Sequence, residues 1–216
     1  MKNILKNHKY LLLFCFVFLA ACSNNISSTE YSARGEMYLK TGKYAKAEKY
    51  LNKAISINKY DLEAYRNRGT LYYALGDYDK ALADFDYVLS YMPKDSTVLA
   101  AKGALLANAG KYEEAFTNLF QALRLNPSNV SALNSTAGLF FLIGNYDKAI
   151  KVYTASLEIH PTPEAYLMRA KCYEKFGQTE EAENDYALAK VLKLGVGNTA
   201  PAESKKEKNT EQESNK

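Results

Sequence analysis

The side chains best suited to nucleophilic or metal chemistry are sparse in this chain. Its 216 residues include three cysteines, Cys15, Cys22 and Cys172, and two histidines, His8 and His160. The sequence contains no HExxH, GxxxxGK[ST], GxSxG or paired-cysteine motif, the patterns that place a metal, a phosphate or an activated nucleophile. We therefore predict that the chain is not an enzyme, has no metal site and needs no cofactor.

Cys172 and the carboxylates also favour structural roles. Cys172 stands beside Tyr173, at a packing position of a predicted helix, and no histidine lies within reach to activate it. A buried, inert thiol is thus favoured over a nucleophile. Glu180, Glu181 and Glu183 are expected on a solvated helix face rather than in acid–base machinery.

Cys22 directly follows the one strongly apolar run of the chain. Lys2, Lys6 and Lys9 precede "YLLLFCFVFLAA", a run of 12 residues that ends at Ala21. A membrane-spanning helix needs about 20 apolar residues, so this run is too short to be a comfortable span. A basic start, a short apolar run and small residues at its end are typical of a secretory signal peptide. We assign residues 1–21 to such a peptide.

The four residues Leu19-Ala20-Ala21-Cys22 resemble the lipobox of bacterial lipoproteins. That resemblance implies cleavage before Cys22, lipidation of its thiol and acylation of the new amino terminus. An ordinary signal peptide that happens to contain a cysteine is the alternative. Ser23 stands where an Asp would favour retention at the inner membrane, so the resemblance implies the periplasmic face of the outer membrane. Residues 22–27 would form the lipidated cysteine and a short tether.

Removal of residues 1–21 changes the charge and the cysteine content. The net charge is +4, of which three lysines of the signal contribute +3, so the remainder is close to +1. A nearly neutral chain gives no electrostatic case for nucleic acid, which binds a basic face. With Cys15 removed and Cys22 acylated, Cys172 would be the only free thiol, which excludes an intramolecular disulfide.

The body of the chain repeats at an interval of 34 residues. Two sets of small residues recur at that interval: Gly35, Gly69, Gly103 and Ala137, and Ala47, Ala81, Ala115 and Ala149. A fifth unit follows with one residue fewer, since Ala170 comes 33 residues after Ala137. Each unit is predicted to contain two helices joined at a glycine: Gly42, Gly76, Gly110, Gly144 and Gly177. Self-similarity at this period is typical of stacked helix pairs.

This pattern resembles the tetratricopeptide repeat (TPR) family, although its usual Trp is absent and Tyr or Leu replaces it. The resemblance implies an all-α, right-handed superhelical solenoid of five helix pairs. We place the repeats at about 28–61, 62–95, 96–129, 130–162 and 163–194. Pro93, Pro127 and Pro161 are expected to end second helices, and Ser27-Ser28-Thr29-Glu30 to form a capping box. Residues 195–216 have almost no large apolar side chain and are predicted to be a disordered charged tail.

In TPR proteins the first helices usually line a concave groove that binds ligands, and a partner segment is expected there. The candidate groove residues are Arg66, Asn67, Thr70, Tyr73, Ala100, Ala104, Asn108, Asn134, Phe141 and Lys171. Small residues in the middle would leave room, while Tyr73 and Phe141 would serve as apolar anchors. The alternative is that these two rings merely cover neighbouring units. A carboxylate clamp of Lys, Arg and Asn is disfavoured, because the centre carries Ala100, Ala104 and Gly138.

The end of the last helix offers a second surface. Val191, Leu192 and Leu194 have no following helix to cover them, so a partner or a second copy of the chain, as a homodimer, is expected to dock there. Architecture and length look like those of small TPR lipoproteins that serve type IV or tight-adherence (Flp) pilus systems. The function this implies is a scaffold for assembly of a pilus or secretion machine. The alternative is an adaptor that recruits peptidoglycan hydrolases or proteases at the envelope.

Overall fold

The computed structural model describes residues 26–194, which form ten helices and no strands within that range. The helices are α2 (Ser28–Lys40), α3 (Tyr44–Ile57), α4 (Leu62–Leu75), α5 (Tyr78–Tyr91), α6 (Ser96–Asn108), α7 (Tyr112–Leu125), α8 (Val130–Leu142), α9 (Tyr146–Ile159), α10 (Pro163–Phe176) and α11 (Thr179–Lys193). Consecutive helices pair into units one to five. The predicted signal peptide, the lipidation site Cys22 and the charged tail lie outside the described residues.

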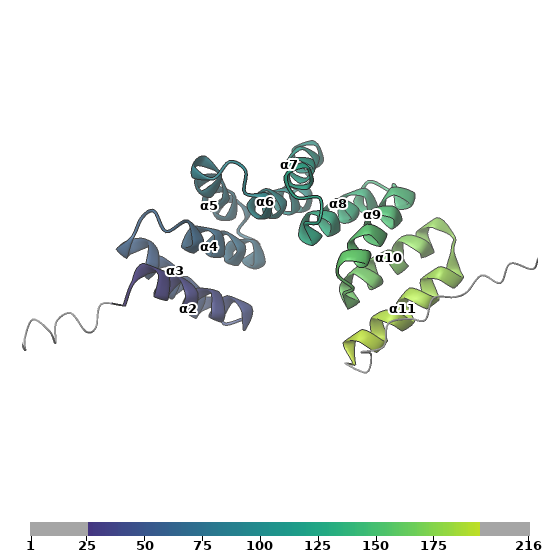
Figure 1. The fold of residues 1–216 in the computed structure, drawn as a ribbon, viewed down its shortest axis with the longest axis horizontal. Coiled ribbons are helices and arrows are strands. Elements are labelled where there is room, and N and C mark those ends of the chain that lie inside the picture. The colour runs from purple at the N-terminus through teal and green to yellow at the C-terminus, as the bar shows by residue number, and fades with distance from the viewer. Residues whose placement is uncertain (1–25, 195–216) are drawn as a thin grey trace, which may run out of the picture.

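The five pairs follow one another along an arc (Figure 1). Each first helix packs against its own second helix and against the first helix of a neighbouring unit, as α2 does against α3 and α4. In the middle of the arc, α5 and α7 lie on the outer side, and α4, α6 and α8 line the inner side (Figure 1). The predicted all-α solenoid of helix pairs is confirmed. None of the helices between residues 26 and 194 is both long and apolar enough to cross a membrane.

Local sequence signals set the helix ends as predicted. Every predicted turn glycine has a positive φ, between 69° and 88°, a region in which a Cβ would be strained. The second helices α5, α7 and α9 each end two residues before a proline. Ser27 caps α2 by accepting a hydrogen bond from the Glu30 amide at 3.2 Å. The reciprocal half of the capping box was a wrong prediction, because the Glu30 carboxylate pairs with Arg34 at 2.7 Å instead.

In units one to three the two helices approach each other closely at the small residue of the repeat. A Cβ built on Gly103 would lie 2.6 Å from Leu119 Cγ and 3.2 Å from the Ala115 carbonyl oxygen. Gly35 and Gly69 show the same contact with Leu51 and Phe85. In contrast, a Cβ on Gly138 would meet only the Tyr153 hydroxyl, at 3.5 Å, an ordinary contact distance. Gly138 therefore leaves open space that Gly103 does not.

This difference predicts opposite effects for two chemically identical substitutions. Gly103→Ala should destabilise the fold by about 1–3 kcal/mol, because the added methyl group forces Leu119 or the backbone to shift. Gly138→Ala should stabilise it by about 0.5–1 kcal/mol, the gain of alanine over glycine inside a helix. Urea denaturation of both variants measures the difference. Equal effects would contradict the predicted close approach at Gly103.

Two buried arginine–aspartate pairs join the helices of units two and five. Arg68 donates two hydrogen bonds to Asp84, at 2.7 and 2.8 Å, and Arg169 binds Asp185 in the same way. The Arg68 guanidinium also lies between the rings of Tyr65 and Tyr72, at 5.2 and 5.8 Å from their centroids. Such forked geometry is the strong form of an ion pair. These pairs therefore fix the register between first and second helices.

Cys172 is fully buried in α10. Burial raises the pKa of the thiol to about 11, so the neutral form dominates at physiological pH. We expect iodoacetamide at pH 8 to leave Cys172 unmodified in the native chain and to modify it in urea, as read by peptide mass mapping. Fast modification of Cys172 in the native chain would contradict this expectation.

The raised pKa of Cys172 also lowers the free energy of unfolding at high pH. Between about pH 9 and 11 the unfolded thiol loses its proton while the folded one keeps it, so stability falls as pH rises through that window.

Candidate functional site

A hollow on the concave side is built from the first helices of four consecutive units. Its volume is about 290 Å³, and we call it the central hollow. It is lined by Tyr73 of α4, Ala104, Ala107 and Asn108 of α6, Ser135, Gly138, Leu139, Phe141 and Leu142 of α8, and Met168 of α10. The lining carries no charged side chain, so it suits an apolar segment with a few polar atoms.

The floor of the central hollow is open because its residues are small. Ala104, Ala107 and Gly138 face it from adjacent helices, and Gly138 leaves the space described above. The helix α6, which carries two of them, is held in place by the fully buried Leu105, which packs in a core cluster with Phe85 and Val98. The cavity is thus shaped by the absence of side-chain bulk on a rigid scaffold.

Two aromatic rings stand at opposite sides of the central hollow. Tyr73 packs against Tyr78 of its own unit, with ring centroids 6.1 Å apart, and Phe141 packs against Tyr146 at 5.5 Å. The Asn108 amide Nδ2 donates to the Tyr73 hydroxyl at 2.6 Å, and burial raises the pKa of Tyr73. Both rings therefore pack within their own units and also line the hollow, and Tyr73 contacts the next unit through Asn108.

The structure brings together four of the ten predicted groove residues: Tyr73, Ala104, Asn108 and Phe141 line the central hollow. Ala100 does not, because it is fully buried in a core cluster that includes Ala132 of α8. Asn134 accepts a hydrogen bond from Ser156 at 2.7 Å, which uses its carbonyl oxygen inside unit four. Lys171 is exposed on α10. Ser135, Leu139 and Met168 also line the hollow and were not predicted, because their exposure depends on the stacking of α8 and α10.

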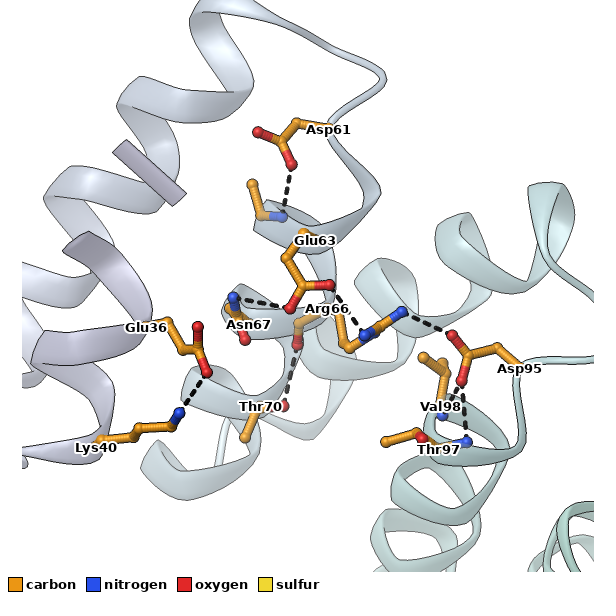
Figure 2. A network of polar contacts seen from close by, with 11 residues as sticks. Glu36, Lys40, Asp61, Glu63, Arg66, Asn67, Thr70, Asp95, Thr97 and Val98 are labelled. Carbon is orange, nitrogen blue, oxygen red and sulfur yellow. Dashed lines mark hydrogen bonds and ion pairs between the residues drawn. The ribbon is translucent and has the colours of Figure 1, made fainter. Parts of the chain in front are cut away.

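The remaining predicted residues belong to a self-contained polar network near units one to three (Figure 2). Arg66 donates to Asp95 at 2.8 Å and pairs with Glu63 at 2.9 Å. Asn67 is only 8% exposed and its amide reaches Glu63 at 3.4 Å, while Thr70 donates to the Arg66 carbonyl oxygen at 3.0 Å. Most of their polar groups thus bind neighbours, although the buried Arg66 Nε has no hydrogen-bond partner among the described residues. The concave side therefore divides into a polar N-terminal half and an apolar central hollow.

At the other end of the solenoid, the predicted edge is exposed. Val191 is 44% and Leu194 65% accessible, whereas Leu192 is partly covered. No group of three or more potential metal ligands occurs among residues 26–194.

Family models now define the class of protein. TPR models match residues 26–92, 66–129, 100–162 and 163–190, which together span almost all of the described chain. The chain therefore belongs to the tetratricopeptide repeat family. Repeats of this kind are typically non-catalytic scaffolds for protein–protein interaction, and this fold suits a protein partner. No curated protein matches the sequence significantly.

Several solved structures share the fold. TTC0263, a thermophilic TPR protein of Thermus thermophilus, is 24% identical with a TM-score of 0.70, and the match covers 79% of this chain and 96% of that one. A TPR protein from Parabacteroides merdae is 26% identical with a TM-score of 0.64, covering 79% of this chain and 66% of that one. MamA of MSR-1 is 22% identical with a TM-score of 0.56, covering 79% and 98%. These similarities establish the architecture.

Proposed function

We propose that this chain is a lipid-anchored TPR scaffold at the periplasmic face of a bacterial outer membrane, which binds an apolar segment of a partner protein during assembly of a pilus or secretion machine. The observation that carries the binding role is the central hollow, an uncharged cavity with aromatic rings at its sides. The observation that motivates the anchor is the Leu19–Cys22 lipobox pattern. The resemblance in architecture and length to small pilus-system lipoproteins motivates the role in pilus or secretion assembly.

The chemistry of the hollow selects the occupant. Its small-residue floor admits bulk, and its rings offer apolar contact area of the kind that dominates interface energies. Asn108 and Ser135 add a few donors and acceptors at the rim, enough to fix the orientation of a backbone or a polar side chain. The best match is a helix or extended segment that presents one large apolar side chain to the floor near Gly138.

Filling the hollow tests this role. Gly138→Leu places a side chain into the open space and is expected to abolish co-purification of envelope partners while the fold is retained. Thr117→Leu adds the same side chain to an exposed position of the outer helix α7 and is the matched control. Equal recovery of partners by both variants would reject the hollow as the binding site. Recovery of cell-wall hydrolases instead of pilus or secretion components would favour the adaptor role.

A further inference from the structure

A second hollow lies in unit one, at the end of the solenoid nearest the chain's N-terminus. Its volume is about 660 Å³, and we call it the unit-one hollow. It is lined by Ile26, Tyr31 and Arg34 and by Lys49, Tyr50, Asn52, Lys53 and Ser56 of α3. Three of these side chains are cationic, two are aromatic and none is acidic. Neither the repeat architecture nor the proposed function accounts for this combination.

The next repeat shows how the equivalent place is closed in unit two. One unit on, Asp84 occupies the position of Tyr50 and holds Arg68 through two hydrogen bonds. Tyr87 occupies the position of Lys53, and the centroid of its ring lies 4.1 Å from the ring centroid of Tyr65. In unit two the space is therefore filled by an ion pair and a ring stack.

Unit one departs from that pattern toward positive charge at each of these positions. The acid is replaced by Tyr50, the stacking ring by Lys53, Ala83 by Lys49 and Asp86 by Asn52. Of the three lining cations, Arg34 is paired with an acid outside the lining, Glu30, at 2.7 Å. Lys49 and Lys53 are exposed and, among the described residues, form no ion pair. The ring centroids of Tyr31 and Tyr50 lie 5.9 Å apart, so the hollow combines two neighbouring aromatic rings with an excess of positive charge.

The position of the hollow in the chain selects the source of the complementary anion. Ile26, which lines it, is four residues from Cys22. A tether of that length reaches at most about 14 Å, so acylation of Cys22 would hold the hollow at the membrane surface. Lysine, arginine and tyrosine are the side chains that settle at that depth, since cations meet lipid phosphates and phenol rings lie at the headgroup level.

We propose that the unit-one hollow docks onto anionic lipid head groups and so fixes the orientation of the solenoid on its membrane. This inference rests on the lipid anchor of the proposed function and adds a second, electrostatic membrane contact to it. The residues that line the central hollow belong to units two to five, so the docking surface shares none of them.

Tryptophan quenching tests the docking, because the chain has no native tryptophan. Tyr31→Trp, or Ser56→Trp should the first variant not fold, gives a single reporter in the hollow of the purified full-length chain. The chain is incorporated into phosphatidylcholine vesicles with or without phosphatidylglycerol, each containing a lipid with a nitroxide-labelled head group. We expect a quenched population that grows with phosphatidylglycerol and shrinks at high salt. Equal quenching in the two vesicles would overturn the proposal.

Charge variants test whether the lysines of the unit-one hollow cause the quenching on anionic vesicles. A lysine at an anionic surface contributes about a fivefold preference, so Lys49→Gln with Lys53→Gln should lower the ratio of quenched to unquenched reporter about 30-fold. Lys190→Gln with Lys193→Gln removes the same charge from α11 and should leave that ratio unchanged. Similar losses in both pairs would also overturn the proposal. The mass of the purified chain shows separately whether Cys22 is acylated. A chain without acyl groups would reject the lipid anchor of the proposed function. Quenching of its tryptophan by added anionic vesicles would still test whether the unit-one hollow binds anionic lipid.

Discussion

Replacing Asp84 with alanine is expected to lower the free energy of unfolding by about 3 kcal/mol or more. The carboxylate side chain is only 6% exposed and makes both hydrogen bonds of the forked pair with Arg68. Its removal leaves a guanidinium, itself only 20% exposed, without its counter-charge between two tyrosine rings. Urea denaturation monitored by circular dichroism measures the loss.

Asp86 supplies a control two residues away on the same helix. It pairs with Lys102 at 2.5 Å, yet its side chain is 56% exposed. Exposed pairs contribute little, so Asp86→Ala should cost about 1 kcal/mol or less. If Asp84→Ala cost no more than Asp86→Ala, the buried pair would not be fixing the helices of unit two. Replacing both Arg68 and Asp84 with leucine should recover part of the loss, since no buried charge is then left unpaired.

Replacing both Tyr73 and Phe141 with alanine is expected to weaken partner binding about a thousandfold. Aromatic anchors in a water-excluding interface each contribute about 2 kcal/mol or more, and about 1.4 kcal/mol corresponds to a tenfold change in affinity. Both rings are only partly buried and lie at the surface of their packing clusters, so we expect the solenoid to stay folded. Titration calorimetry with the co-purified partner measures the affinity, and circular dichroism checks the fold.

The outer helix α7 provides the matching control. Tyr112 and Phe120 are 39% and 52% exposed there, so Tyr112→Ala with Phe120→Ala removes the same two ring types away from the central hollow. That variant should bind the partner like the unsubstituted chain. Comparable losses in both double variants would show that binding reflects general aromatic surface, and unchanged binding in both would exclude the hollow.

The architecture of the solenoid was predictable from the sequence because it depends on local, repeated signals. The 34-residue interval, the turn glycines such as Gly76 and the prolines after α5, α7 and α9 each act within one unit. They need no knowledge of distant contacts. The same is true of the small residues at Gly69 and Gly103, since their recurrence in register predicts the close approach that the structure shows.

The groove was predicted only in part, because its surface depends on how neighbouring units stack. Ala100 carries the correct spacing for a first-helix surface, but packing of α8 covers it completely. Arg66 was expected to face a ligand, but its guanidinium donates a hydrogen bond to Asp95, the residue that caps the start of α6. The sequence did contain one signal that was missed: Arg68 and Asp84, like Arg169 and Asp185, are separated by 16 residues.

Photo-crosslinking from the central hollow in living cells tests the central claim most directly. A benzophenone amino acid replaces Leu142, which lines the hollow and is 52% exposed, so the probe should not disturb the core. The control probe replaces Phe120, equally exposed on the outer helix α7. We predict that the Leu142 probe captures a pilus or secretion component, identified by mass spectrometry, and that the Phe120 probe does not. The same captures from both positions, or none from Leu142, would contradict a partner-binding role for the central hollow.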